Sequence, residues 1–225
     1  MMKNNKIFIA CDNTNISKIK EIINKTQSSK LKVGYKFGLE FLNSKNGRNF
    51  ISKLKNQITF GDYKFSDIPN TCVSAIKSVS DLNFNYLTMH ISAGLNALTA
   101  AKKVSKKTKL IGVTILTSLD NKSLKEIGFN KNIKKLVIHQ AKLANKAKLD
   151  GIVCSAQEVS IVKKVFKKEI ITPGIRFGSA SDDQKRIVTP KQAFKNGSDW
   201  LVIGRPITKG NIKKNFKKLI DHLSQ

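Results

Sequence analysis

Residues 60–71 read Phe-Gly-Asp-Tyr-Lys-Phe-Ser-Asp-Ile-Pro-Asn-Thr, after a short β-like run and before a helix-like one. Because alternate residues of a strand point the same way, we expect Asp62 and Lys64 to share one pocket while Tyr63 faces away. Asp67 lies on the loop that opens the helix. An ammonium group beside two carboxylates suits acid–base or electrostatic chemistry. The alternative interpretation is an ordinary ion pair at a strand end, with Asp67 as a helix cap.

Length, apolar content and cysteine spacing restrict the class of protein. The chain of 225 residues is long enough to bury one sizeable core. It contains no run of eighteen apolar residues and no signal-peptide pattern at its first residues, so we expect a soluble, cytoplasmic protein with no membrane partner. Its three cysteines, Cys11, Cys72 and Cys154, lack metal-ligand spacing, and we expect reduced thiols.

The formal net charge of +27 makes nucleic acid a candidate partner. The lysines, however, are scattered over nearly every helix-like segment, and aromatic residues do not alternate with them. We therefore attribute the charge to a lysine-rich composition and expect no specific nucleic-acid binding. A diffuse positive field would still attract small anions, nucleotides included.

Short apolar runs alternate with longer amphipathic ones along the whole chain, and no linker or repeat interrupts them. The eight predicted strands are Ile7–Cys11, Leu31–Gly34, Gln57–Gly61, Tyr86–His90, Leu110–Leu116, Gly151–Cys154, Ile170–Thr172 and Trp200–Ile203. This alternation predicts an α/β fold, a single (β/α)₈ barrel domain over residues 1–225. An open doubly wound sheet would usually carry a glycine-rich loop after its first strand, which residues 11–15 do not form.

A barrel of this kind carries its catalytic groups at the carboxyl ends of several strands. Polar or reactive residues occur at or near the end of every predicted strand: Asp12, Lys32, Asp62 with Lys64, His90, Thr117 with Ser118, residues 154–157, residues 172–176, and residues 203–206. The opposite strand ends are introduced by Lys, Asn and Asp, which are typical of solvated turns. The sequence therefore predicts one functional rim.

These segments also carry a resemblance to a known family. The string at residues 60–71 resembles, almost letter for letter, the corresponding string of orotidine 5′-phosphate decarboxylases. Further matching segments follow in family order: Asp12, Leu31–Gly34, His90–Ser92, Val113–Ser118, Val153–Glu158, Thr172–Arg176 and Ile203–Ile207. Two departures are visible: residues 91–94 read Ile-Ser-Ala-Gly where Ala-Ser-Gly-Gly is common, and the loop over residues 176–184 is about one residue short.

The resemblance implies that the protein converts orotidine 5′-monophosphate to UMP, the last step of pyrimidine synthesis, without metal or cofactor. Lys64 would stabilise the carbanion at C6 and protonate it, and Asp62 would lie near the departing carboxylate. Lys32 and Asp67 would complete a network of alternating charge that keeps Lys64 protonated. No lysine poised for a Schiff base and no cofactor motif is evident in the sequence.

The resemblance also implies how substrate is held and how subunits associate. Gly204 and Arg205 suit a phosphate near strands seven and eight, and the family adds Arg176 and Gln184. The resemblance also implies that Asp12 bonds the ribose hydroxyls, that Thr117 lies near the pyrimidine, and that Pro173 contacts the substrate. In the family, the residues that match Asp67, Ile68 and Thr71 reach the neighbouring site, which implies a homodimer.

Two other functions stay open. One is a related barrel enzyme that acts on sugar phosphates through Mg²⁺, of the 3-keto-L-gulonate 6-phosphate decarboxylase or hexulose phosphate synthase type; the Ile-Pro-Asn-Thr at residues 68–71 argues against it. The other is a nucleic-acid-binding protein, which only the charge suggests. His90 is interpreted as a structural histidine, because a histidine at an apolar strand end usually bonds within the protein.

Overall fold

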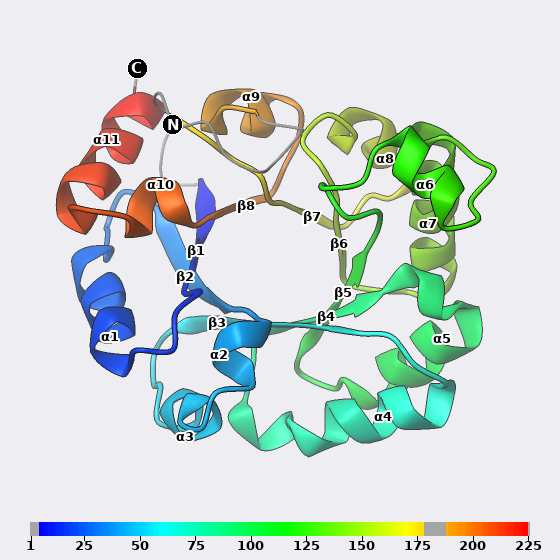
Figure 1. Ribbon diagram of the computed structural model, residues 1–225, viewed down its shortest axis with the longest axis horizontal. Coiled ribbons are helices and arrows are strands. Elements are labelled where there is room, and N and C mark those ends of the chain that lie inside the picture. Colours follow the sequence, from blue (N-terminus) through cyan, green and yellow to red (C-terminus); the bar gives the residue numbers. More distant parts are fainter. Residues whose placement is uncertain (1–4, 178–187, 225) are drawn as a thin grey trace.

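The computed structural model describes residues 5–177 and 188–224, and these form a closed parallel barrel in the order β1 to β8 (Figure 1). The strands are β1 (Lys6–Ala10), β2 (Lys32–Phe37), β3 (Ile58–Phe65), β4 (Tyr86–His90), β5 (Lys109–Val113), β6 (Gly151–Val153), β7 (Glu169–Thr172) and β8 (Trp200–Ile203). Pairing of β1 with β8 closes the ring. The prediction of a (β/α)₈ barrel is thus confirmed, and two strands, β4 and β8, have the predicted bounds.

Helices surround the barrel on its outside (Figure 1). They are α1 (Ile16–Lys25), α2 (Leu39–Leu42), α3 (Gly47–Ser52), α4 (Pro69–Ser78), η2 (Ser80–Leu82), η3 (Ile91–Ala93), α5 (Leu95–Val104), α6 (Asn121–Glu126), α7 (Ile133–Lys146), α8 (Val159–Val165), α9 (Pro190–Lys195), α10 (Arg205–Thr208) and α11 (Ile212–Ser224). Within the described ranges, no helix combines the length and the apolar character needed to cross a membrane.

Helix α1 illustrates why these segments fold as they do. The side chain of Asn15 accepts hydrogen bonds from the backbone N–H groups of the first turn, which no residue of the helix itself can satisfy. Its isoleucines recur at helical spacing, and Ile19, Ile22 and Ile23 are buried against the barrel. Helix α11 lies beside α1 and completes the outer ring (Figure 1).

The barrel interior is closed at its amino-terminal end by four aromatic side chains. The ring of Phe8 stacks on Trp200 with centroids 4.1 Å apart, and Phe60 and Tyr86 pack against it at 4.9 and 5.2 Å. Gly34 makes room for this packing, because a Cβ there would lie 2.7 Å from the Phe8 ring. These rings fill the barrel interior, and the cavity that could hold a ligand lies toward the carboxyl ends of the strands.

Strand β3 is irregular where it carries the charged residues. Its pairing with β4 runs Phe60↔Tyr86 and Gly61↔Leu87 and resumes at Phe65↔Met89. Such a bulge bends a strand and re-aims its side chains, and bulges are common beside active sites. The predicted strand ended at Gly61, and the structure extends it through the bulge to Phe65.

Candidate active site

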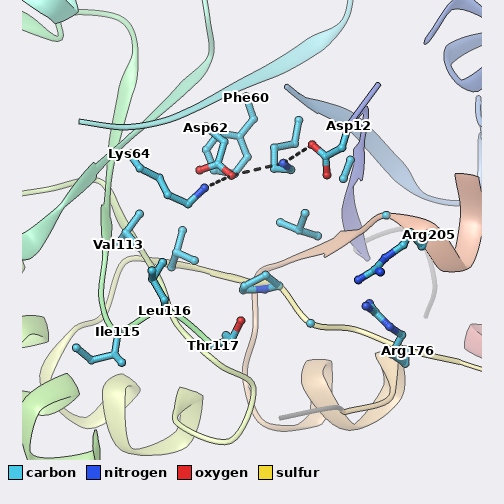
Figure 2. A pocket seen from close by; sticks show the side chains of 17 residues that line it. Asp12, Phe60, Asp62, Lys64, Val113, Ile115, Leu116, Thr117, Arg176 and Arg205 are labelled. Carbon is cyan, nitrogen blue, oxygen red and sulfur yellow. Dashed lines mark hydrogen bonds and ion pairs between the residues drawn. The ribbon is translucent and has the colours of Figure 1, made fainter. Parts of the chain in front are cut away.

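A cavity of about 250 Å³ opens at the carboxyl ends of the strands. Most of its walls come from strand ends and from the loops that follow them (Figure 2). The lining residues are Ala10, Asp12, Lys36, Phe60, Asp62, Lys64, Val113, Ile115, Leu116, Thr117, Val153, Pro173, Gly174, Arg176, Val202, Gly204 and Arg205. One wall is charged and another is apolar, so the cavity can hold a ligand with both kinds of surface.

A row of alternating charge crosses the cavity in the order Asp12, Lys36, Asp62, Lys64 (Figure 2). Lys36 Nζ lies 2.9 Å from Asp12 Oδ1 and 3.5 Å from Asp62 Oδ2. Lys64 Nζ donates to the same Asp62 oxygen at 2.7 Å. The exposed fractions of the side chains are 11% for Lys36, 13% for Asp62 and 30% for Lys64. Of the two ammonium groups, that of Lys64 is therefore the more accessible to a ligand.

The pKa values of the two buried members of the row follow from their partners. Burial raises the pKa of the Asp62 carboxyl, but the charges of Lys36 and Lys64 and hydrogen bonds to the carboxylate outweigh burial and leave the pKa below its ordinary range. Burial lowers the pKa of Lys36, whereas the two neighbouring carboxylates raise it by more. Asp62 and Lys36 are therefore both ionised at neutral pH.

The structure corrects the prediction for Lys32. Lys32 begins β2, pairs in register with Lys6 at the amino-terminal end of β1, and is exposed. Lys36 lies four residues further along, which corresponds to about 13 Å of strand. The predicted strand ended at Gly34, so the residue at its true carboxyl end was missed. Extending the strand by three residues, to the Phe37 that ends β2, would have placed Lys36 at the rim.

Two arginines line the cavity away from the charged row. The guanidinium groups of Arg176 and Arg205 point into the same part of the pocket, apart from Lys64 (Figure 2). Arg176 is only 7% exposed, and its Nη1 donates to the carbonyl of Ile175 at 3.0 Å. Arg205 follows Gly204 directly after β8. Paired guanidinium groups are suited to bind an anion with several oxygens, such as a phosphate.

The cavity contains most, but not all, of the residues that the sequence singled out. Besides the charged row and the arginines, it brings together Thr117, Pro173 and Gly204. Gln184 lies outside the described residues. Sequence reasoning missed the apolar wall, to which Val113, Ile115, Leu116 and Val153 contribute. These residues lie within the last four positions of two predicted strands, but an apolar side chain there gives no signal that distinguishes the cavity wall from the core.

The segment that follows Lys64 does not line this cavity. Residues 66–71 are all exposed, and Ile68 exposes 66% of its surface. Within the described ranges, the Asp67 carboxylate forms no ion pair and accepts a hydrogen bond from the N–H of Ile68 at 2.7 Å. Asp67, Ile68 and Thr71 thus do not line the site of their own chain.

His90 is half-buried at the end of β4 and does not line the cavity. Burial and the nearby charge of Lys64 lower the pKa of its imidazole, which is therefore neutral at neutral pH. Its position agrees with a structural rather than a substrate-binding residue. Within residues 5–177 and 188–224, no three His, Cys, Asp or Glu side chains are arranged to hold a metal ion.

Comparison with known proteins places the chain in one family. Residues 5–217 match the model of the orotidine 5′-phosphate decarboxylase / HUMPS family. The orotidine 5′-phosphate decarboxylase of Wolbachia sp. subsp. Brugia malayi is 45% identical, with 96% of this chain and 97% of that protein covered. The one from Vibrio cholerae serotype O1 (strain O395) is 39% identical, over 92% of this chain and 93% of the other.

Solved structures agree with this assignment. The crystal structure of orotidine 5′-phosphate decarboxylase from Lactobacillus acidophilus superposes with a TM-score of 0.83 at 28% identity, covering 98% of this chain and 100% of that one. The Methanocaldococcus jannaschii enzyme complexed with the inhibitor BMP gives 0.78 at 21% identity, covering 98% and 99% of the two chains, and supports the fold alone. The charged row, the rim segments and these matches together show that the chain belongs to the orotidine 5′-phosphate decarboxylase / HUMPS family.

Proposed function

We propose that this protein decarboxylates orotidine 5′-monophosphate to UMP. The observation that carries the proposal is the row Asp12, Lys36, Asp62, Lys64, which lies in one cavity with an apolar wall and two arginines. Family membership and the named relatives support the same reaction. The substrate has matching parts: an anionic pyrimidine carboxylate at one end, a ribose, and a phosphate at the other.

The chemical step needs a way to stabilise electrons on carbon. The bond from C6 to the carboxylate breaks, its electron pair stays on C6, and CO₂ leaves. The ammonium of Lys64 stabilises the developing carbanion and then transfers a proton from Nζ to C6, and Lys64 recovers a proton from water. Because this interaction strengthens as the negative charge develops, it lowers the barrier more than it improves substrate binding.

The other members of the row hold the Lys64 ammonium in place. The Asp62 carboxylate, near the substrate carboxylate, disfavours the ground state and favours loss of CO₂. Lys36 takes the role that the sequence assigned to Lys32, because its charge offsets that of Asp62 and Asp12 in a poorly hydrated site. Asp12 also faces the cavity and bonds the ribose hydroxyls. Thr117 and Pro173 contact the pyrimidine.

The phosphate is bound at the far end of the cavity. Arg176 and Arg205 donate to its oxygens, and Gly204 lets the backbone approach closely. Gln184, which lies outside the described residues, is a further phosphate contact that the family resemblance implies. Binding energy from this end is used to position the pyrimidine against Lys64.

The active form is a homodimer with shared sites. The exposed segment 66–71 carries Ile68 and the Asp67 carboxylate outward, and both would gain partners at a subunit interface. In the dimer, Asp67 extends the charged row of the neighbouring site, and Ile68 and Thr71 contact its substrate. The cytoplasmic location stays a prediction from the sequence.

The direct test is conversion of orotidine 5′-monophosphate to UMP, followed by loss of absorbance, with and without EDTA. We expect equal rates in both samples. A parallel assay offers hexulose and gulonate sugar phosphates with Mg²⁺. Turnover of those substrates that EDTA abolishes, with no loss of the orotidine absorbance, would replace this proposal with the Mg²⁺-dependent alternative.

A further inference from the structure

The bulge of β3 sets one residue of β4 against three residues of β3. Pairing is regular at Gly61↔Leu87 and again at Phe65↔Met89, so residues 62–64 stand opposite Thr88 alone. Lys64 has a φ of 53° there, a left-handed conformation that is uncommon for a residue with a side chain. The strand thus loses regular ladder bonds at the place where Asp62 and Lys64 must be held accurately.

The hydroxyl of Thr88 replaces those missing bonds. Thr88 is fully buried, and its Oγ1 accepts a hydrogen bond from the backbone N–H of Lys64 at 2.9 Å. The same oxygen donates to Asp62 Oδ1 at 3.0 Å. The direction of both bonds is fixed, because an N–H can only donate and a carboxylate can only accept. One hydroxyl therefore ties the backbone of one charged residue to the side chain of the other.

This arrangement also orients the Asp62 carboxylate. Its Oδ1 is occupied by Thr88, which leaves Oδ2 toward the ammonium groups of Lys64, at 2.7 Å, and Lys36, at 3.5 Å. Without the hydroxyl, rotation of the carboxylate would redistribute these contacts. The backbone N–H of Lys64 would also lose its hydrogen-bond acceptor, which supports the left-handed conformation of this residue. Both changes would move the Lys64 ammonium relative to a bound ligand.

We propose that Thr88 is a positioning residue, which acts through Asp62 and Lys64 and does not touch substrate. The inference rests on the proposed decarboxylation for its kinetic consequence. Its structural consequence, the geometry of the bulge, is independent of which reaction the protein performs. Thr88 is 24 residues from Lys64 in the sequence and is absent from the lining of the cavity.

The test compares Thr88→Val, which keeps the shape and removes the hydroxyl, with Thr88→Ser, which keeps the hydroxyl. The matched control is Thr26→Val, since Thr26 is also fully buried, its hydroxyl bonds the carbonyl of Ile22 and the hydroxyl of Tyr35, and it lies at the end of α1. Measurements are kcat, the Kd of UMP, Tm, and a crystal structure of each Thr88 variant.

For Thr88→Val we expect kcat to fall by about 100-fold, because misplacement of a reacting group by about 1 Å can have that effect. The Kd of UMP should change by no more than about threefold, since UMP lacks the developing charge. Thr88→Ser should retain kcat within about fivefold, because its hydroxyl can make both bonds. Thr26→Val should lower Tm as Thr88→Val does, yet keep kcat.

Several outcomes would overturn the inference. These are a Thr88→Val enzyme with more than about a third of the wild-type kcat, a Thr88→Ser enzyme as impaired as Thr88→Val, or equal losses of kcat and UMP affinity. The crystal structures test the positioning role of Thr88 independently of activity. We expect the Lys64–Asp62 hydrogen bond to be broken in Thr88→Val and kept in Thr88→Ser, and an unchanged bulge in Thr88→Val would contradict the role. An inactive wild type would instead count against the proposed function alone.

Discussion

At the scale of single residues, the candidate site is a row of paired charges on one wall of the cavity. A buried carboxylate or ammonium alone would shift its pKa and become neutral. In the charged row, each inner member has an opposite charge on both sides: Lys36 lies between Asp12 and Asp62, and Asp62 lies between Lys36 and Lys64. Removal of an inner member leaves its neighbours uncompensated, and this is more harmful than removal of an exposed charge.

The two lysines of β2 provide a matched pair of substitutions. Lys36→Ala should lower kcat/KM at least about 100-fold, because Asp12 and Asp62 then repel each other and an anionic substrate. Lys32→Ala, at the opposite end of the same strand, should stay within about twofold of wild type. Steady-state kinetics on both variants check this, and a larger loss in Lys32→Ala would contradict the placement of the site.

His90 should make stability depend on pH. Its folded-state pKa is lowered by burial and by the charge of Lys64, so the unfolded state takes up the proton first as the pH falls through about 6.5. Stability is therefore greatest above this pH and decreases below it. Denaturant unfolding between pH 7.5 and 5.5 should show a steeper loss for wild type than for His90→Gln. Parallel curves would exclude this effect of burial on His90.

At the scale of elements, different strand ends supply different parts of the site. Strands β1 to β3 carry the charged row, β5 and β6 carry most of the apolar wall, and the segments after β7 and β8 carry the arginines. Since each βα loop can vary without disturbing the barrel, different ends can bind different parts of one substrate. The two halves of the proposed ligand should therefore be separable by mutation.

Arg205→Ala tests the segment after β8. We expect KM for orotidine 5′-monophosphate to rise at least about tenfold, because a guanidinium–phosphate contact is lost. The kcat should fall too where phosphate binding helps to position the pyrimidine. Arg48→Ala is the control, since Arg48 pairs with Asp81 at 2.6 Å on the surface and should not affect either constant. Orotidine has no phosphate, so the Arg205→Ala and wild-type enzymes should convert it at the same rate. A difference between these two rates would contradict a phosphate-binding role for Arg205.

At the scale of the whole molecule, the proposed subunit interface is the exposed segment 66–71. The exposed segment 66–71 follows β3 directly, and we propose that it packs against a second subunit and contributes to the cavity of that subunit. A twofold axis repeats any such contribution in both directions. Shared sites make activity depend on which subunit carries which defect.

Mixed dimers provide the test. Lys64→Ala and Asp67→Ala homodimers should each be inactive, with kcat lower by many powers of ten for Lys64→Ala and UMP affinity little changed. Refolded together in equal amounts, about half the dimers pair one subunit of each kind, and one of their two sites has both groups intact. Activity should then return to about a quarter of a wild-type sample refolded alike. If Asp67 serves its own subunit, every site keeps one defect and no activity returns.

The sequence by itself determined the fold class and the greater part of the site. Alternation of apolar runs specifies eight strands, because a parallel strand and its covering helix have different hydrophobic periods. The spacing of Asp62 and Lys64 predicted that they meet, and they do, at 2.7 Å. The segments around Arg176 and Arg205 were likewise found from residue type and place at strand ends.

Only the tertiary structure decided which lysine enters the row and what holds the bulge. Lys32 and Lys36 are four positions apart on one strand, so their side chains point to the same face of the sheet. The sequence pattern therefore predicts the face on which each lysine lies, but not its height, that is, its position along the barrel axis. Height depends on register with β1 and β3, which are formed by distant residues. Thr88 could not be predicted as a partner of Asp62 for the same reason: it meets that carboxylate across 26 residues, through a local loss of register between two strands.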